Sequence, residues 1–205
     1  MNLAHADLRE KLLALIGGRR GHFQMESGYH SEQWFTLDRM FAQPEALRPY
    51  VVELAKRLAA HQPDAVCGPM TGGAKLAGLI AAELGVEYFF TERFAPRDAT
   101  GLFPVRSAVP EARRAAVRGK SAVIVDDAVS AGSAVRGSYA DLVACGARPV
   151  ALGALFVFGA GAARFAAEKN LALESLVQTS FGIWPPAECP LCKSGVELEI
   201  VSDLA

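Results

Sequence analysis

The chain has 205 residues and a formal net charge of −1, and this length suits one globular domain with a sizeable core. The near-neutral charge gives no support for a nucleic acid or a membrane surface as a partner. The N-terminus is too charged for a signal peptide, and no apolar run reaches the length of a membrane span. We therefore expect a cytoplasmic protein whose four cysteines are reduced.

The first part of the chain predicts a helix followed by a small hairpin. Leucines at helical spacing predict a helix over 3–16. Residues 23–28 read as a short strand and a turn, and residues 31–38 read as a second strand. A hairpin that only covers the core is the simplest interpretation, but the aromatic pair Trp34-Phe35 would also suit stacking on a flat heterocycle.

The next part alternates helices and strands. The pattern predicts a helix over 44–60, a strand over 65–69, a helix over 75–84 and a strand over 86–91. This alternation is typical of a parallel sheet flanked by helices. The loop after the first strand is either a plain strand–helix turn or an anion cradle at a helix N-terminus, built from Thr71, Gly72 and Gly73.

Residues 92–120 form an arginine-rich segment. Before Lys120 it contains no lysine and no histidine, and residues 103–107 are expected to form a strand in a flexible flap. Arginine is a good bidentate partner for phosphate oxygens and a poor proton donor. The segment, with Arg93 at its start, therefore reads either as a phosphate-binding flap or as a solvated basic loop.

The most informative pattern covers residues 122–134. An apolar strand ends in Asp126 and Asp127, and a loop of small residues over 130–133 opens into a helix that runs to about Ala144. Such a loop directs free N–H groups and the helix dipole at a phosphate. The carboxylates suit sugar hydroxyls or a divalent cation. The pattern favours a sugar phosphate over an ordinary acidic strand end with a helix cap.

The last part predicts a strongly apolar strand over 150–158 and a helix that carries Arg164. The tail contains Cys189-x-x-Cys192, which could be half of a zinc site completed by Cys67 or by a dimer mate. Because a single such pair is a weak signal, we favour two packed thiols and assign no metal ligand to the protein.

Taken together, these residues resemble the type I phosphoribosyltransferases. Residues 122–134 resemble their motif for phosphoribosyl pyrophosphate (PRPP), and residues 183–195 resemble the tail of a short-chain branch of orotate phosphoribosyltransferases. The resemblance implies one α/β domain over 1–205, with a central parallel sheet flanked by helices. It also implies a small hood from about 18–40 and 180–200.

The resemblance further implies transfer of the 5-phosphoribosyl group of PRPP to a base, with release of pyrophosphate. Orotate is the expected base, in pyrimidine nucleotide synthesis; another base, or a non-catalytic PRPP-binding protein, are the alternatives. Mg²⁺ would bind through PRPP or pyrophosphate. A homodimer is expected, in which a mobile loop within 92–120 reaches the partner's pyrophosphate.

Site residues carry over from the family motifs by position. Catalytic roles are implied for Asp126, Asp127 and Arg93. PRPP-binding roles are implied for Asp126, Asp127, Ala128, Val129, Ser130, Ala131, Gly132, Ser133, Ala134, Thr71, Gly72 and Gly73. Base-binding roles are implied for Ser27, Gly28, Trp34, Phe35 and Ser130.

The chain departs from the orotate enzymes at two positions. They usually end the strand that corresponds to 150–158 in an arginine that meets the orotate carboxylate, whereas this chain has Phe158. A missing charge-assisted hydrogen bond of this kind costs about 1.5–3 kcal/mol. They also often carry lysine where Glu26 stands, and an acid there cannot assist a pyrophosphate.

Overall fold

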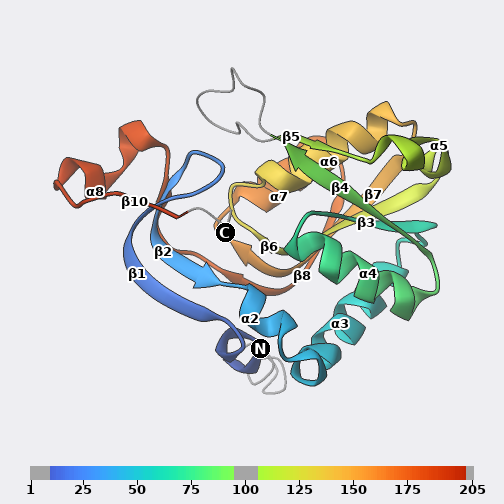
Figure 1. Ribbon diagram of the computed structural model, residues 1–205, viewed down its shortest axis with the longest axis horizontal. Helices are drawn as coiled ribbons and strands as arrows, with labels where there is room; N and C mark the ends of the chain where they lie inside the picture. The colour runs from blue at the N-terminus through green and yellow to red at the C-terminus, as the bar shows by residue number, and fades with distance from the viewer. Residues whose placement is uncertain (1–9, 95–105, 202–205) are drawn as a thin grey trace.

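The computed structural model describes residues 10–94 and 106–201 and contains two sheets (Figure 1). The expected first helix is represented by a helical segment at 10–14, and the rest of its predicted range up to residue 9 lies outside the described residues. No helix in the described part of the chain is long and apolar enough to cross a membrane.

The larger sheet has six strands in the order β5-β4-β3-β6-β7-β8. All neighbours pair in parallel except β5, which is antiparallel to β4. The fold class expected from the sequence is therefore confirmed. The strands are β3 (Ala65–Pro69), β4 (Glu87–Phe94), β5 (Arg106–Ala108), β6 (Ser121–Val129), β7 (Arg148–Phe158) and β8 (Ala172–Thr179).

Helices cover both faces of this sheet, and each face has its own apolar core. On one face α3 (Pro44–Ala59) and α4 (Gly72–Leu84) pack over a core that includes Val123. On the other face α6 (Ser133–Ala144) and α7 (Gly161–Lys169) pack over a core that includes Ile124. Successive residues of β6 enter opposite cores because side chains alternate along a strand. The shorter helices are α2 (Asp38–Phe41), η1 (Glu111–Arg113), α5 (Arg114–Val117), η2 (Pro186–Glu188) and α8 (Pro190–Lys193).

The second half of the arginine-rich segment packs onto the sheet. Val109 and Val117 are buried in the second core, and Arg114 forms a 3.0 Å ion pair with Asp141 of α6. Residues 106–120 are therefore not a solvated loop throughout, because β5 and these contacts attach them to the sheet. Residues 95–105, which include most of the predicted strand at 103–107, lie outside the described residues.

The smaller sheet has the order β10-β1-β2-β9 and is made by two distant parts of the chain. The hairpin of β1 (Gly17–Gln24) and β2 (His30–Thr36) was expected, although β1 begins six residues earlier than predicted. β9 (Ile183–Trp184) and β10 (Glu199–Ile200) add to its two edges. We call residues 17–36 and 183–200 the hood.

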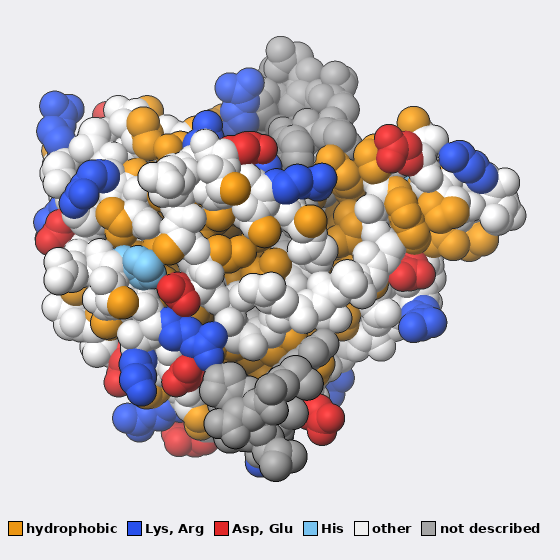
Figure 2. Space-filling model, turned by 180° about the vertical axis from the view of Figure 1, so that it is seen from behind, with side chains coloured by type: hydrophobic (Ala, Val, Ile, Leu, Met, Phe, Trp, Pro, Cys, Tyr) orange, Lys and Arg blue, Asp and Glu red, His pale blue; other side chains and the backbone are white. Residues whose placement is uncertain are grey.

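The hood lies beside the carboxyl ends of the large sheet, toward which the arrowheads of the strands point (Figure 1). Its far end, at the right of Figure 2, projects beyond the body of the molecule and carries hydrophobic side chains on its surface. Exposed apolar residues of the hood include Val196 and Ile200. The hood therefore forms one wall of the region where the strands end.

Candidate active site

The neighbouring strands β3 and β6 diverge at their carboxyl ends. The chain leaves β3 for α4 on one face of the sheet and leaves β6 for α6 on the other. A parallel sheet has a crevice at such a switch point, and ligands bind there. The two loops that the sequence analysis selected as anion cradles follow these two strands, so the fold places them side by side.

The acid pair occupies this crevice, but it lies inside β6 and not after it, because β6 continues to Val129. Asp126 is buried, with 8% of its surface exposed. The backbone N–H of Asp127 donates to Asp126 Oδ1 over 3.1 Å, and that of Ala128 donates to Asp127 Oδ1 over 2.9 Å. These bonds hold the carboxylates against the strand, and no ion pair with either is found among the described residues.

Gly72 and Gly73 pack directly against these carboxylates. They form the first turn of α4. The sequence had suggested instead that they lie in a loop before a helix beginning at Lys75. A Cβ atom on Gly72 would lie 2.1 Å from Asp127 Oδ2, and one on Gly73 would lie 2.6 Å from Asp126 Oδ1. Neither position has room for a side chain while the acids keep their places. The two cradles are thus in contact through the acid pair.

Burial raises the pKa values of both acids, and the two side chains affect each other. Burial raises the pKa of Asp126 well above its usual value, and the neighbouring Asp127 raises it further. Burial also raises the pKa of Asp127, and the hydrogen bond with Asp126 opposes that rise. A cation or a hydroxyl donor in the crevice would relieve the repulsion.

The loop after β6 has the geometry of an anion cradle. Gly132 has a left-handed backbone with φ of 87° and precedes the first residue of α6. Within the described part of the chain, no acceptor is found for the N–H groups of Gly132, Ser133 and Ala134. The start of α6 therefore keeps its unpaired donors and its positive dipole end for a ligand.

Arg93 lies near the carboxyl end of β4, inside the strand and not directly after it as the sequence analysis placed it. Its guanidinium forms an ion pair with Glu26 of the hood, and its Nη1 donates to the carbonyl of Met70 over 3.3 Å. The Met70–Thr71 peptide bond is cis. The acid at position 26 therefore has a partner, and the two residues join the hood to the first cradle.

The expected aromatic face is split between two sides of β2. Trp34 and Phe35 are consecutive in the strand, so their side chains leave opposite faces and cannot both stack on one base. Phe35 stacks on Phe158 with ring centroids 4.7 Å apart and planes 9° from parallel. The ring of Trp34 lies near that of Phe23 instead, with ring centroids 6.1 Å apart.

Phe158 ends β7 at the position where the orotate enzymes usually have arginine, and it is buried. Its ring also packs on Phe181, which the sequence analysis did not select and which no sequence pattern marks. Of the remaining expected residues, Ser27 is buried and its Oγ accepts from Tyr29 N–H over 3.4 Å. Gly28 turns the chain with φ of 81°. Thr71 is exposed at the start of α4.

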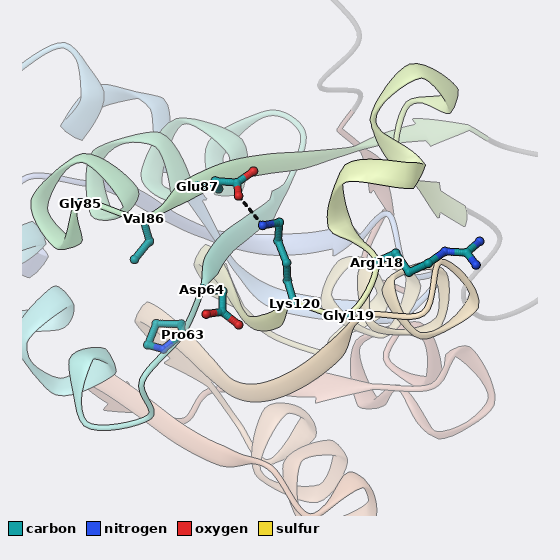
Figure 3. A pocket seen from close by; sticks show the side chains of 8 residues that line it. All are labelled: Pro63, Asp64, Gly85, Val86, Glu87, Arg118, Gly119 and Lys120. Carbon is teal, nitrogen blue, oxygen red and sulfur yellow. Dashed lines mark hydrogen bonds and ion pairs between the residues drawn. The ribbon is translucent and has the colours of Figure 1, made fainter.

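A second hollow lies at the opposite end of the large sheet, at the amino ends of β3, β4 and β6 (Figure 3). Three of the charged side chains that line it are engaged with one another or with the backbone. Lys120 pairs with Glu87, and Asp64 accepts the N–H of Ser121 over 2.8 Å. This end of a parallel sheet does not carry the ligand site.

Comparison with known proteins agrees with this geometry. The sequence profile of the Phosphoribosyl transferase domain matches residues 43–177. An orotate phosphoribosyltransferase of Heliobacterium modesticaldum is 35% identical, with 85% of each chain covered. One of Thermotoga petrophila is 31% identical, with 94% of each chain covered. The crystal structure of an adenine phosphoribosyltransferase from Rhodothermus marinus superposes with a TM-score of 0.66 at 16% identity, covering 85% of this chain and 99% of that one.

Proposed function

The chain belongs to the phosphoribosyltransferase family, and from that premise we propose that it transfers the 5-phosphoribosyl group of PRPP to orotate. The products are orotidine 5′-phosphate and pyrophosphate. The observation that carries the proposal is the contact of Gly72 and Gly73 with the acid pair, because it brings both cradles to one crevice. The full-length similarity to orotate enzymes supports the choice of base.

Each part of the crevice has a task in this reaction. The N–H groups of residues 131–134, with the hydroxyls of Ser130 and Ser133, hold the 5′-phosphate and position the ribose. Asp126 and Asp127 accept hydrogen bonds from the ribose hydroxyls. Thr71, Gly72 and Gly73 face the pyrophosphate from the start of α4, where the dipole favours negative charge. These groups fix C1 of the ribose between the leaving pyrophosphate and the base.

The chemistry replaces one bond at C1 of the ribose by another. The bond to the pyrophosphate oxygen breaks as a base nitrogen attacks, through a ribose with cation-like character. The electron pair of the broken bond leaves with the pyrophosphate, and the proton of the attacking nitrogen passes to the pyrophosphate or to solvent. The two carboxylates stabilise positive charge on the ribose. Arg93 exchanges part of its contact with Glu26 for pyrophosphate oxygens, since a guanidinium binds phosphate oxygens in pairs.

Mg²⁺ fits the donor set of the crevice. Hard cations take oxygen ligands, and the acid pair offers carboxylate oxygens that form no ion pair with a described Lys or Arg side chain. Asp126 and Asp127 would help to hold the ion through water. When bound, Mg²⁺ supplies neutralisation of the leaving pyrophosphate.

The base lies on the side of β2 that carries Phe35, because Phe35 stacks on Phe158 at the carboxyl end of β7. In this proposal the buried turn with Ser27 and Gly28 contacts the base from the hood. An aromatic wall suits any flat heterocycle. Phe158 therefore favours a second candidate, transfer to a base without a carboxylate, and this is the one specific observation against orotate.

Pyrophosphate release tests the proposal and separates the alternatives. We expect release with Mg²⁺, PRPP and orotate, and none with other pyrimidines or purines. Release only with another base would replace orotate by that base. Calorimetric binding of PRPP without release for any base would make the chain a PRPP-binding protein.

Calorimetric binding of PRPP tests the role of the two acids. The variant Asp126→Asn/Asp127→Asn should lose PRPP binding, whereas Glu168→Gln, an exposed substitution on α7, should keep it. Equal binding by the double variant and the unchanged protein would remove the ribose role of the acids.

The oligomeric state and the location in the cell are two further parts of the proposal. We propose a homodimer, to be tested by light scattering with size-exclusion chromatography; a monomer that turns over normally would contradict it. We propose a cytoplasmic location, which the four free thiols support.

A further inference from the structure

Four side chains with metal-ligating atoms meet in the hood, away from the acid pair. His22 is in β1, His30 opens β2, and Cys189 and Cys192 flank the start of α8. Their ligand atoms all lie within 4.8 Å of one another, and three of the four residues are buried. From the sequence we expected two packed thiols, with Cys67 or a dimer mate as the possible further ligands of a zinc site. The two histidines were not considered, and the separations along the chain printed for their contacts with the cysteines are 162 to 170 residues.

We propose that His22, His30, Cys189 and Cys192 bind one structural Zn²⁺ ion, which fastens the C-terminal part of the hood to its hairpin. Two imidazoles and two thiolates are a known structural ligand set for zinc. The spacing of the cysteines, with two residues between them, is typical of one half of such a site. Sulfur and imidazole ligands in a compact group disfavour Mg²⁺ and Ca²⁺, which prefer oxygen.

Four distances between pairs of ligand atoms lie between 3.0 and 3.6 Å, equal to or up to 0.4 Å shorter than the edges of a zinc tetrahedron. With zinc bond lengths near 2.3 Å to sulfur and 2.05 Å to nitrogen, a tetrahedron places two nitrogens about 3.4 Å apart and nitrogen and sulfur about 3.6 Å apart. His22 Nε2 and His30 Nδ1 are 3.0 Å apart. Cys192 Sγ lies 3.6 Å from His22 Nε2 and 3.2 Å from His30 Nδ1, and Cys189 Sγ lies 3.4 Å from His22 Nε2.

The backbone around the cluster orients the ligands. The other ring nitrogen of His22, Nδ1, lies 2.8 Å from the carbonyl oxygen of Val196. If Nδ1 donates its hydrogen there, Nε2 presents its lone pair to the cluster, as is usual for a histidine that binds a metal. A shift in the pairing of β1 with β2 falls between Arg20 and Phe23, so a bulge aims His22 at the cluster.

The position of the cluster suggests what the ion does. His22 and His30 bracket the turn that carries Glu26, Ser27 and Gly28, so a shared ligand at both ends would hold that turn in shape. The cysteines attach residues 189–192 to the same point. The claim that the metal supports base binding rests on the proposed function. The claim that zinc binds to the cluster does not depend on it.

Metal content and spectroscopy test the site without an activity assay. The purified full chain, dialysed against Zn²⁺ and then against metal-free buffer, should hold about one zinc per chain by atomic emission. The variant Cys189→Ser/Cys192→Ser should hold none. Cys145→Ser is the matched control, because its thiol is also buried but contacts Asp141 at 3.7 Å, outside the cluster.

Measurements on the unchanged chain keep the test decisive if the double variant fails to fold. Removing zinc with a chelator should lower the melting temperature by at least about 5 °C, and added zinc should restore it. Co²⁺ in its place should give a thiolate-to-cobalt charge-transfer band and the intense visible bands of a tetrahedral ion. Zinc below about one-tenth per chain, zinc retained by the double variant, or an octahedral Co²⁺ spectrum would each overturn the proposal.

Discussion

Replacing Asp126 by asparagine should weaken the binding of PRPP and at the same time stabilise the fold. The substitution keeps the shape of the side chain and removes the buried ionisable carboxyl group that lies next to Asp127. Binding falls because a charge-assisted hydrogen bond to a ribose hydroxyl is lost, at a cost of about 1.5–3 kcal/mol. At 1.4 kcal/mol per tenfold, the Kd for PRPP should rise roughly 12- to 140-fold.

Stability should change in the opposite direction, with a defined dependence on pH. Burial and repulsion raise the folded-state pKa of Asp126, so ionisation of this group costs folding free energy. Below about pH 4, the ordinary range of a carboxyl group, it is neutral in both states and the effect vanishes. As the pH rises through the folded-state pKa, the unchanged protein loses stability that Asp126→Asn keeps.

The size of the gain follows from the same linkage. Each unit by which the pKa is raised corresponds to about 1.4 kcal/mol. For a chain of this size, 1 kcal/mol moves the melting temperature by about 2–4 °C. The variant should therefore melt about 3–6 °C higher at pH 7 for each such unit.

Calorimetric titration with Mg²⁺ and PRPP, and melting curves from pH 4 to 8, measure both effects. Asp141→Asn is the contrasting control. Its carboxylate accepts from Arg114 and from the N–H of Val109, so it should melt lower and bind PRPP normally. Unchanged PRPP binding by Asp126→Asn, or a lower melting temperature at pH 7, would refute the reasoning.

Three other outcomes are expected. Gly72→Ala should abolish PRPP binding by calorimetry, because its Cβ would lie 2.1 Å from Asp127 Oδ2; binding within threefold of normal would contradict the contact. Phe158→Ala should lower the free energy of unfolding by about 3–5 kcal/mol in urea, since the ring is buried against Phe35; a loss below about 1 kcal/mol would show that the stack is absent. Burial raises the pKa of Cys67 to about 12, so at pH 8 only about one thiol in ten thousand is ionised and alkylation in the native state should be far slower than after unfolding; equal rates would count against its burial.

Local patterns predicted the parts of the molecule that are organised locally. The strand over 65–69 and the helix that begins at Pro44 were predicted within a residue, because apolar spacing and a proline at the helix start mark them. The small-residue loop and helix after the acids were also predicted. The residues of this loop and helix are contiguous in the chain, so a single segment of sequence is enough to predict a phosphate-binding turn.

The parts that the sequence could not reveal depend on contacts between distant segments. Arg93 pairs with Glu26, 67 residues away along the chain, so its sequence context could not reveal this ion pair. The end of β6 was placed too early because two carboxylates are poor strand residues, yet pairing with β7 extends the strand through them. The opposite orientations of Trp34 and Phe35 could have been predicted from the sequence, because side chains alternate between the two faces of a strand.

The pairing of distant strands in the hood affects the order in which the parts of the molecule fold. The strands of the large sheet join mostly neighbours connected by one helix, whereas β1 pairs with β10 across Phe23 and Glu199. Contacts between residues so far apart in the chain form late, since a long loop must close first. A nascent or partly folded chain would thus acquire its phosphate cradles before its base pocket, and sugar-phosphate recognition would precede discrimination among bases.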